Sequence, residues 1–454
     1  MQATSADIVI CGAGIAGIST AYYLATRYGI TNIVLLDERP PLSLTSDKST
    51  ECYRNWWPGP DAAMVQLMNR SIDLLEELVV ESNRQFYLEQ RGYVYATANP
   101  DRISSLCNAA EQAAQYGAGP VRLHQETPSD LSYDPAAQNV VGSDVILDTK
   151  LIRTHFPYLS DQTIALIHAR RCGWFSAQQL GMYMLEQVRA LGIRLINGCV
   201  IGVEVHNNAI ESVSTNNPEA TRIMTNTFVN AAGPLLREVG QMMSVDLPVF
   251  CERHLKMAFN DYLGVVPRKA PMLIWDDPLA LMWAEDERQF LAESEESQWL
   301  LDLLPPGIHT RPEGGLESTT ILMLWAYDTR PVPPVFPISI EPEFLEVVLR
   351  GMISMIPGLQ AYVDRTPKPF IDGGYYIKTC ENRPLIGALP VDGAYVVGAL
   401  SGFGVMAACG AGELVASHIV TAHLPEYAAA FRLSRYEDAA YQAKLVQWES
   451  LDQL

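Results

Sequence analysis

The stretch Asp7-Ile-Val-Ile-Cys-Gly-Ala-Gly-Ile-Ala-Gly17 decides the fold of this chain. Four apolar-leaning residues near its start predict a buried parallel strand, and the residues after the glycines predict a helix over 18–27. Gly12 permits a tight turn, Gly14 lets the backbone approach a pyrophosphate, and Gly17 lets the helix pack on the strand. The start of the helix also presents unpaired N–H groups and a positive dipole end to phosphate.

A second apolar strand is predicted over 33–36 and leads into Asp37, 20 residues after Gly17. An acidic side chain at this spacing binds ribose hydroxyls in dinucleotide-binding proteins. A lone glycine fingerprint is weak evidence, but strand, turn, helix, second strand and acid follow one another here in the expected order. The sequence therefore predicts a dinucleotide-binding unit; a glycine-rich turn without a ligand is the weaker alternative.

The composition limits the class of protein. With 454 residues and 48% hydrophobic content, the chain is long enough for about two or three domains with apolar cores. Its net charge of −20 argues against nucleic acid as a partner and against docking on an anionic membrane, because both need a basic surface.

The N-terminus and the cysteines favour a cytoplasmic protein. No basic segment followed by an apolar one precedes the first strand, so we expect no secretory signal. We expect no apolar run of the roughly 18 residues that a membrane span needs. The eight cysteines are scattered, without a CxxC pair or a Cys/His cluster at metal-binding spacing, so we expect buried apolar cysteines and no metal site.

Up to about residue 247 the pattern mixes helices and strands. The expected elements are a loop over 43–57, a helix capped by Asp61, a strand over 92–96, a helix over 101–116, a helix-rich stretch over 151–196 that ends in a strand, and strands over 200–205, 209–213 and 227–233.

Residues 247–336 are strand-like and rich in aromatic side chains, which predicts a second domain that forms a cavity. An acidic, helix-leaning insertion over 285–304 and a loop over 305–315 interrupt them. A helix is predicted over 342–355.

A second glycine-rich turn occurs near the other end of the chain. Residues 394–397 predict a strand, Gly398 to Gly404 form the turn, and a helix is predicted over 405–422. Two glycine turns, each followed by a helix, thus stand at opposite ends of the sequence. If both ends meet in one domain, the first helix binds a pyrophosphate. The second then points its N-terminus at another electron-rich group, such as the pyrimidine edge of a flavin.

The motifs that carry these features resemble the D-amino-acid oxidase superfamily of FAD-dependent oxidoreductases, which includes sarcosine oxidase, glycine oxidase and dimethylglycine dehydrogenase. They are GAGIAG (12–17), VLLDE (34–38), STECYR (49–54), FVNAAGP (228–234), CENRPLIG (380–387) and YVVGALSGFG (395–404).

The resemblance implies an α/β fold with an α+β second domain. A Rossmann-like FAD-binding domain, 1–85, 150–247 and 366–454, would be interleaved with an antiparallel-sheet substrate domain, 86–149 and 248–365. An acidic insertion at about 278–318 has no counterpart in the family.

The resemblance also implies the residues that bind FAD. The first glycine turn is expected at the pyrophosphate, the acid at the adenosine ribose, the Ser/Thr loop at the diphosphate or flavin, residues 200 and 231–233 at the adenine pocket, and the second glycine turn around the flavin ring. The expected residues are Gly12, Ala13, Gly14, Ile15, Ala16, Gly17, Asp37, Glu38, Arg39, Ser46, Ser49, Thr50, Val200, Ala231, Ala232, Gly233, Gly398, Leu400, Ser401, Gly402, Phe403, Gly404, Val405 and Met406.

Two departures from the family pattern concern the attachment of FAD. In the sarcosine oxidase branch a cysteine shortly before the PLIG-like stretch holds the flavin covalently, and the corresponding residue here is Gly374. In dimethylglycine-type enzymes a histidine just after the early Ser-Thr pair does so, and Cys52 stands in that neighbourhood. The resemblance therefore implies non-covalent FAD.

Two further departures concern the acceptor and the substrate. The family lysine that helps oxygen react corresponds to Met323, which favours a dehydrogenase over an oxidase. The lysine that meets a substrate carboxylate after the second glycine turn corresponds to Met406, which favours a bulkier or less anionic amine than sarcosine.

Arg54, His254, Tyr327 and Arg383 are the expected catalytic or substrate-binding residues. The planar guanidinium of Arg54 suits a carboxylate clamp, and Arg383 is expected to stabilise charge on the reduced flavin. Tyr327 and His254 are candidates for the cavity wall. Arg54 is at least as well explained as a structural residue, and for His254 the structural explanation is the stronger.

These features predict an enzyme that oxidises the C–N bond of a small-molecule amine or amino acid. Hydride passes to flavin N5, the imine product is hydrolysed, and O2 or another acceptor takes the electrons. One alternative is a 2-hydroxy-acid or glycerol-phosphate type dehydrogenase, which needs a base such as His254 or His155 beside the flavin. Another is a flavin-bound assembly factor without turnover. The substrate, the acceptor and the oligomeric state stay open.

Overall fold

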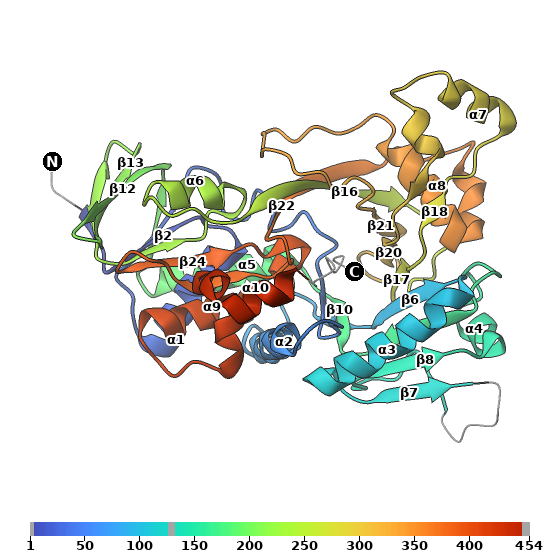
Figure 1. Ribbon diagram of the computed structural model, residues 1–454, viewed down its shortest axis with the longest axis horizontal. Helices are drawn as coiled ribbons and strands as arrows, with labels where there is room; N and C mark the ends of the chain where they lie inside the picture. The colour runs from blue at the N-terminus through green and yellow to red at the C-terminus, as the bar shows by residue number, and fades with distance from the viewer. Residues whose placement is uncertain (1–3, 126–131, 447–454) are drawn as a thin grey trace.

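The computed structural model describes residues 4–125 and 132–446. Figure 1 shows the N-terminal elements in blue beside the C-terminal elements in red, in the part of the molecule that holds β2 and β24. The middle of the chain builds the other part, around β6, β17, β20 and β21. The expected α/β fold is confirmed.

A six-stranded sheet joins the two ends of the chain. Its order is β11 (Arg194–Asn197), β3 (Ile33–Asp37), β2 (Ile8–Cys11), β15 (Phe228–Asn230), β24 (Ala394–Gly398) and β23 (Leu385–Ala388). All neighbours pair in parallel except β23, which is antiparallel to β24. The strands have almost no exposed side chains, as in a sheet covered on both faces.

Helices from both chain ends cover this sheet. α1 (Ile15–Tyr28) packs on α9 (Gly404–Ile419) and α5 (Ala177–Ala190), and α9 also packs on α2 (Ala63–Glu81). Helices α1 and α9 approach closely, because an added Cβ on Gly412 would lie 2.7 Å from the backbone carbon of Ser19. The hydroxyl of Ser19 donates to the carbonyl of Ala408 at 2.8 Å. The first and last glycine turns are thereby held in one layer.

A nine-stranded sheet forms the second part. Its order is β22 (Phe370–Lys378), β16 (Phe250–Asn260), β21 (Thr320–Leu324), β20 (Ile308–Pro312), β17 (Met272–Trp275), β6 (Tyr93–Thr97), β9 (Ala165–Ala169), β8 (Ser143–Ile146) and β7 (Val121–His124). It is antiparallel except for the pairs β6–β17 and β7–β8. One face packs against α8 (Phe344–Met355) in a separate apolar cluster.

Smaller elements complete the chain. A four-stranded sheet has the order β1 (Thr4–Ser5), β14 (Arg222–Met224), β13 (Ala209–Thr215), β12 (Val200–His206), and a three-stranded sheet has the order β4 (Cys52–Arg54), β10 (Cys172–Trp174), β5 (Glu89–Gln90). The remaining pieces are α3 (Ile103–Ala113), α4 (Thr149–His155), α6 (Leu236–Gln241), α7 (Glu285–Ala292), α10 (Ala439–Leu445) and the hairpin of β18 (Leu279–Ala280) with β19 (Leu303–Leu304).

Two sequence predictions about the middle of the chain are wrong. The expected loop over 305–315 contains β20, a strand buried between β17 and β21. Its five residues stand between a Pro-Pro-Gly turn and a glycine-rich turn, which concealed the strand. The stretch 151–196 is also less helical than predicted, because β9 and β10 lie between α4 and α5.

The sheets do not follow the expected domain boundaries at every point. β9 and β22 fall in segments assigned to the FAD-binding domain, 150–247 and 366–454, but they pair in the nine-stranded sheet. The division into two interleaved domains stays a prediction.

One helical stretch, Ser401–Ile419, has the length and mean hydropathy (1.2) of a membrane span, contrary to the sequence prediction. It consists largely of α9, and 72% of its most apolar window is buried inside the protein. The core helix of a globular fold has the same properties, so this stretch is weak evidence for a span.

The contact between α1 and α9 can be tested with Gly412→Ala. The added methyl group overlaps Ser19, so we expect the free energy of unfolding of the apoprotein to fall by about 2 kcal/mol. Urea unfolding followed by circular dichroism measures it. Gly315→Ala is the control, because no atom lies within 4 Å of its added Cβ. Equal stability of the two variants would contradict the close approach of the two helices.

Candidate cofactor and substrate site

Three neighbouring strands of the six-stranded sheet end at one cavity. β2, β15 and β24 are adjacent and parallel, so their carboxyl ends meet at one edge, where open α/β sheets bind ligands. The cavity has an empty volume of about 600 Å³, part of which is open to solvent. Its lining includes Gly14, Ile15, Ala16, Ser46, Ser49, Ala231, Gly233, Gly398, Leu400, Ser401, Gly402, Gly404 and Val405, together with Tyr375, Tyr376 and Ile377 of β22.

The first glycine turn has the geometry that a pyrophosphate requires. Gly12 has φ +109°, and a Cβ there would lie 2.3 Å from the carbonyl of Ala231. A Cβ on Gly17 would lie 2.0 Å from the carbonyl of Gly12. Gly14 lines the cavity at the N-terminus of α1, and the N–H of Ile15 donates to Ser46 Oγ at 3.0 Å. The residues present therefore fit a phosphate-bearing dinucleotide.

The acid at the end of β3 lies beside this turn. The carboxylate of Asp37 accepts from the N–H of Ala13 at 2.8 Å and from the N–H of Arg39 at 2.9 Å. Asp37 is partly exposed, and the side chains of Glu38 and Arg39 beside it form an ion pair at 3.6 Å. These three residues, Val200 at the start of β12, and Gly12, Ala13, Gly17, Thr50 and Ala232 do not border the cavity itself, so their predicted contacts with FAD stay predictions.

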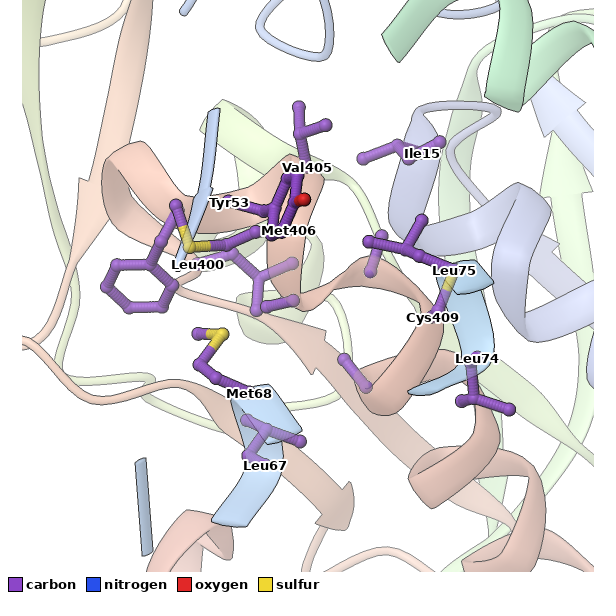
Figure 2. Packing of buried hydrophobic residues seen from close by; sticks show 14 of the residues in the cluster. Ile15, Tyr53, Leu67, Met68, Leu74, Leu75, Leu400, Val405, Met406 and Cys409 are labelled. Carbon is purple, nitrogen blue, oxygen red and sulfur yellow. The ribbon is translucent and has the colours of Figure 1, made fainter. Parts of the chain in front are cut away.

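The second glycine turn borders the same cavity, but two of its expected residues point elsewhere. The ring of Phe403 packs edge-on against Trp57, with centroids 5.2 Å apart. Met406 packs in the apolar cluster with Leu400 and Met68 (Figure 2). Phe403 and Met406 do not line the cavity, so their predicted contacts with FAD stay predictions. In an α-helix, successive side chains point in different directions, and Val405 faces the cavity instead.

A row of side chains crosses the nine-stranded sheet on the face opposite the α8 cluster. Residues opposite one another in adjacent strands lie on one face of a sheet. The strand register aligns six residues in a line, Tyr95, Ile274, His309, Leu324, Lys256 and Asp372.

Arg54 lies at one end of this row. Its Nη1 donates to Tyr95 Oη at 2.8 Å, and its guanidinium carbon lies 4.2 Å from the centroid of the Trp57 ring. Only 3% of Arg54 is exposed. It does not border the cavity, but Trp57 connects it to Phe403 of the second glycine turn.

Met323 lies on the other face of the sheet. It is fully buried in the cluster with Met257 and Trp325. The sequence prediction that placed it toward the flavin is therefore wrong, because alternation in β21 turns Leu324 and not Met323 toward the row. The inference against an oxidase that depended on Met323 loses its basis.

The other three predicted catalytic residues do not border the main cavity. Tyr327 stacks on Trp299, with centroids 5.6 Å apart, and lines a separate pocket with Arg253. Arg383 is buried in an ion pair with Asp61, whose carboxylate also accepts from Ala63 N–H at the start of α2.

His254 is not among the residues that line the cavity. It stacks on Tyr376, with centroids 4.2 Å apart, and its Nε2 lies 3.1 Å from a carboxylate oxygen of Glu252. Tyr376 lines the cavity, and burial lowers the pKa of His254. The structural explanation of this histidine is thus the better supported one.

Sequence reasoning missed His309 and Arg311, because both stand in the unrecognised strand β20. His309 Nδ1 donates to the carbonyl of Gly307 at 2.9 Å, so Nε2 carries the lone pair. Burial lowers the pKa of His309 to about 4, with nearby Arg54 acting in the same direction. A histidine and an arginine two residues apart, between apolar neighbours, were the signal for a strand with one polar face.

Among the described residues, no group of histidine, cysteine, aspartate or glutamate has the arrangement of a metal site. All eight cysteines are free, and Cys52 is buried with its thiol donating to the carbonyl of Thr50 at 3.2 Å. Burial raises the pKa of the Cys52 thiol, which therefore stays protonated at neutral pH.

The cavity fits a dinucleotide, and it is lined by two glycine turns and by strand β22 of the nine-stranded sheet. This arrangement is typical of FAD-binding α/β proteins. The family model described as "FAD dependent oxidoreductase" (DAO) matches residues 7–418. The chain belongs to this family, as its motifs indicated.

Known relatives share modest identity with the chain. It is 23% identical over 314 residues to mitochondrial dimethylglycine dehydrogenase of Rattus norvegicus, which covers 66% of this chain and 33% of that protein. It is 25% identical over 264 residues to sarcosine oxidase subunit beta of Rhizobium meliloti (strain 1021), which covers 56% and 55%. The chain thus matches a third to about half of the length of these relatives. Its fold is similar to that of L-proline dehydrogenase from P. horikoshii, with a TM-score of 0.73, 20% identity, and coverage of 96% and 98%.

Glu51 offers a test of the electrostatics beside the cavity. Burial raises the pKa of Glu51 from 4.5 to about 7, although Lys256 and Arg311 act in the opposite direction, while Glu313 and Asp47 support the rise. A pKa that is higher in the folded state means that stability falls as pH rises from about 4.5 to 7. Glu51→Gln removes this loss, so we expect the variant to gain about 3 kcal/mol over the wild type between pH 4.5 and pH 8.

Urea unfolding of the apoprotein at the two pH values measures this change. Glu295→Gln on the exposed insertion is the control and should give the same difference from the wild type at both pH values. A pH-independent effect of Glu51→Gln would contradict the raised pKa.

Proposed function

We propose that this chain uses FAD to oxidise the C–N bond of a small amine or amino acid. One observation carries the proposal: a single cavity runs from the first glycine turn to the second, and part of its wall comes from Tyr375, Tyr376 and Ile377 of the nine-stranded sheet. Such a cavity would accommodate a long dinucleotide, with its phosphates at α1 and its other end against the sheet. The names of the relatives, a dimethylglycine dehydrogenase and a sarcosine oxidase subunit, support an amine as the substrate.

FAD supplies a hydride acceptor when it is bound. The N-terminus of α1 and Ser46 would hold its pyrophosphate, and Asp37 would bind its adenosine ribose. The N-terminus of α9 would stabilise negative charge through its positive dipole end, because Gly404 and Val405 at its start line the cavity.

FAD is proposed to bind without a covalent link. Gly374 carries no side chain for such a bond, and a Cβ there would meet Lys48 at 3.1 Å and Thr45 at 3.3 Å. The thiol of Cys52 is buried and protonated, which makes it a poor nucleophile.

Arg54 is the proposed clamp for a substrate carboxylate. It is a buried cation near the second glycine turn, and the guanidinium fork binds carboxylates through two hydrogen bonds. Tyr95 and Trp57 would set its orientation. The electron acceptor, O2 or another molecule, and a cytoplasmic location remain predictions from the sequence.

The two other candidate functions have less support. Oxidation of a hydroxy acid would need a base in contact with the substrate, but His254 does not line the cavity. His155 lies at the end of α4 beside Tyr133, with ring centroids 5.1 Å apart, and does not border the cavity. A non-catalytic flavin-bound assembly factor predicts no turnover with any substrate.

The proposal is tested by anaerobic titration of the purified flavoprotein with a panel of amines, amino acids and 2-hydroxy acids. We expect an amine or amino acid to bleach the flavin absorbance near the visible maximum, since reduction removes that band. Reoxidation in air then separates an oxidase from a dehydrogenase. Bleaching by hydroxy acids alone would support C–O oxidation, and no bleaching by any compound would support the assembly factor.

The carboxylate clamp is tested by Arg54→Met with a matched pair of substrates, an amino acid that bleaches the flavin and the amine that lacks its carboxylate. We expect kcat/KM for the amino acid to fall about 100-fold, the equivalent of a charge-assisted hydrogen-bonded pair, with little change for the amine. Arg171→Met, on the pair with Asp73, is the control. An equal loss for both substrates would assign Arg54 a purely structural role.

A further inference from the structure

The loop from Thr45 to Thr50, here the cofactor loop, provides one side of the cavity through Thr45, Ser46 and Ser49. It contains no strand and no regular helix, so its conformation depends on contacts made from outside. Ser46 already accepts a hydrogen bond from Ile15 at the start of α1. The cofactor loop therefore stands between the first glycine turn and the nine-stranded sheet.

Two cations of that sheet, Arg311, which is buried, and Lys256, which is partly buried, hold the backbone of the cofactor loop. The Nζ of Lys256 donates to the carbonyl of Asp47 at 2.7 Å and to that of Ser49 at 2.8 Å. The Nε of Arg311 donates to the carbonyl of Thr50 at 2.6 Å. Lys256 is in β16 and Arg311 in β20, on either side of β21.

The two cations differ in their charge partners. Arg311 forms an ion pair with Glu313, and Glu51 lies 4.0 Å away. For Lys256, the part of the chain that the structure describes provides no carboxylate within 4.0 Å, so backbone carbonyls are its close partners. Burial lowers the pKa of Lys256, while Glu51, Asp47 and Asp372 act in the opposite direction. A cation that is partly removed from water needs strong hydrogen bonds, and both Nζ hydrogen bonds of Lys256 to described residues fall on the cofactor loop.

The rest of the cofactor loop is tied to the same sheet. Lys48 forms an ion pair with Asp372 at 2.7 Å, and the hydroxyl of Thr45 donates to the carbonyl of Tyr375 at 3.1 Å. Asp372 is the neighbour of Lys256 in the cross-strand row. The sheet thus sets the position of the cavity-lining hydroxyls of Ser46 and Ser49 through contacts with the backbone next to them.

We propose that Lys256 and Arg311 are positioning residues for the cofactor. Their hydrogen bonds hold the cofactor loop in its binding conformation, and the positive charge of Lys256 favours the electron-rich reduced form of a bound flavin. The proposal rests on the FAD-binding family and not on the identity of the substrate. A simple link between the two sheets would stabilise the fold without changing the affinity or the potential of the cofactor.

The experiment compares Lys256→Met with the wild type in two measurements. The first is the dissociation constant of FAD from the apoprotein, measured by quenching of flavin fluorescence. The second is the midpoint potential of the bound flavin. We expect the dissociation constant to rise about tenfold or more, because two charge-assisted hydrogen bonds are lost. We expect the midpoint potential to fall, because the positive charge of Lys256 no longer stabilises the reduced form.

Two further variants complete the design. Lys256→Arg keeps the charge and should restore most of the potential, whereas Lys269→Met on the exposed surface should leave both quantities at wild-type values. If Lys256→Met does not fold, Lys256→Gln replaces it, since the amide keeps a donor without the charge.

Wild-type affinity and potential in a folded Lys256→Met or Lys256→Gln protein would overturn the proposal. A loss of apoprotein stability with unchanged affinity and potential, or failure of both variants to fold, would likewise assign Lys256 to a structural link. A wild-type protein that takes up no FAD would refute the proposed function itself, before any comparison of variants.

Discussion

The packing of α1 on α9 is the contact on which the rest of the structure depends. Ser19 and Gly412 let the two backbones approach so closely that even a methyl group would not fit between them. This contact joins residues almost 400 positions apart in the chain and aligns β2, β15 and β24 as neighbours. The glycine turns that follow the first and last of these strands then face the same cavity. A single cavity between two helix N-termini is the consequence.

The second constraint is the junction between the two large sheets. β22 belongs to the nine-stranded sheet, yet its residues 375–377 line the cavity at the edge of the six-stranded sheet. Lys256 and Arg311 reach from the same sheet to the backbone of the cofactor loop. The cofactor site is thus built from both parts of the chain, and these two cations lie where the parts meet. Figure 1 shows α7 of the acidic insertion far from β2 and β24.

The elements with strong local signals were predictable. The run of apolar residues before Gly12, the glycine spacing and the acid at 37 determine β2, α1 and β3, and the second glycine turn determines β24 and α9. The strand β20 was not predictable in this way, because Pro305-Pro306-Gly307 and the following glycines resemble a loop. Because β20 was not predicted, His309 and Arg311 were missed as well. The error at Met323 has the opposite cause: β21 was recognised, but a shift of one residue reverses the face of a strand.

The sequence by itself determined the family, the dinucleotide unit and most of the residues that line the cavity, because short-range glycine and apolar patterns specify backbone conformation directly. Only the tertiary structure decided which polar side chains meet. Arg383 pairs with Asp61, Tyr327 faces a second pocket, and Lys256 binds the cofactor loop. These outcomes depend on strand register and on contacts between residues hundreds of positions apart. Local sequence propensity specifies neither the strand register nor these long-range contacts. The face that a side chain occupies depends on how its strand pairs with the partner strand, and not on the residues next to it in the sequence.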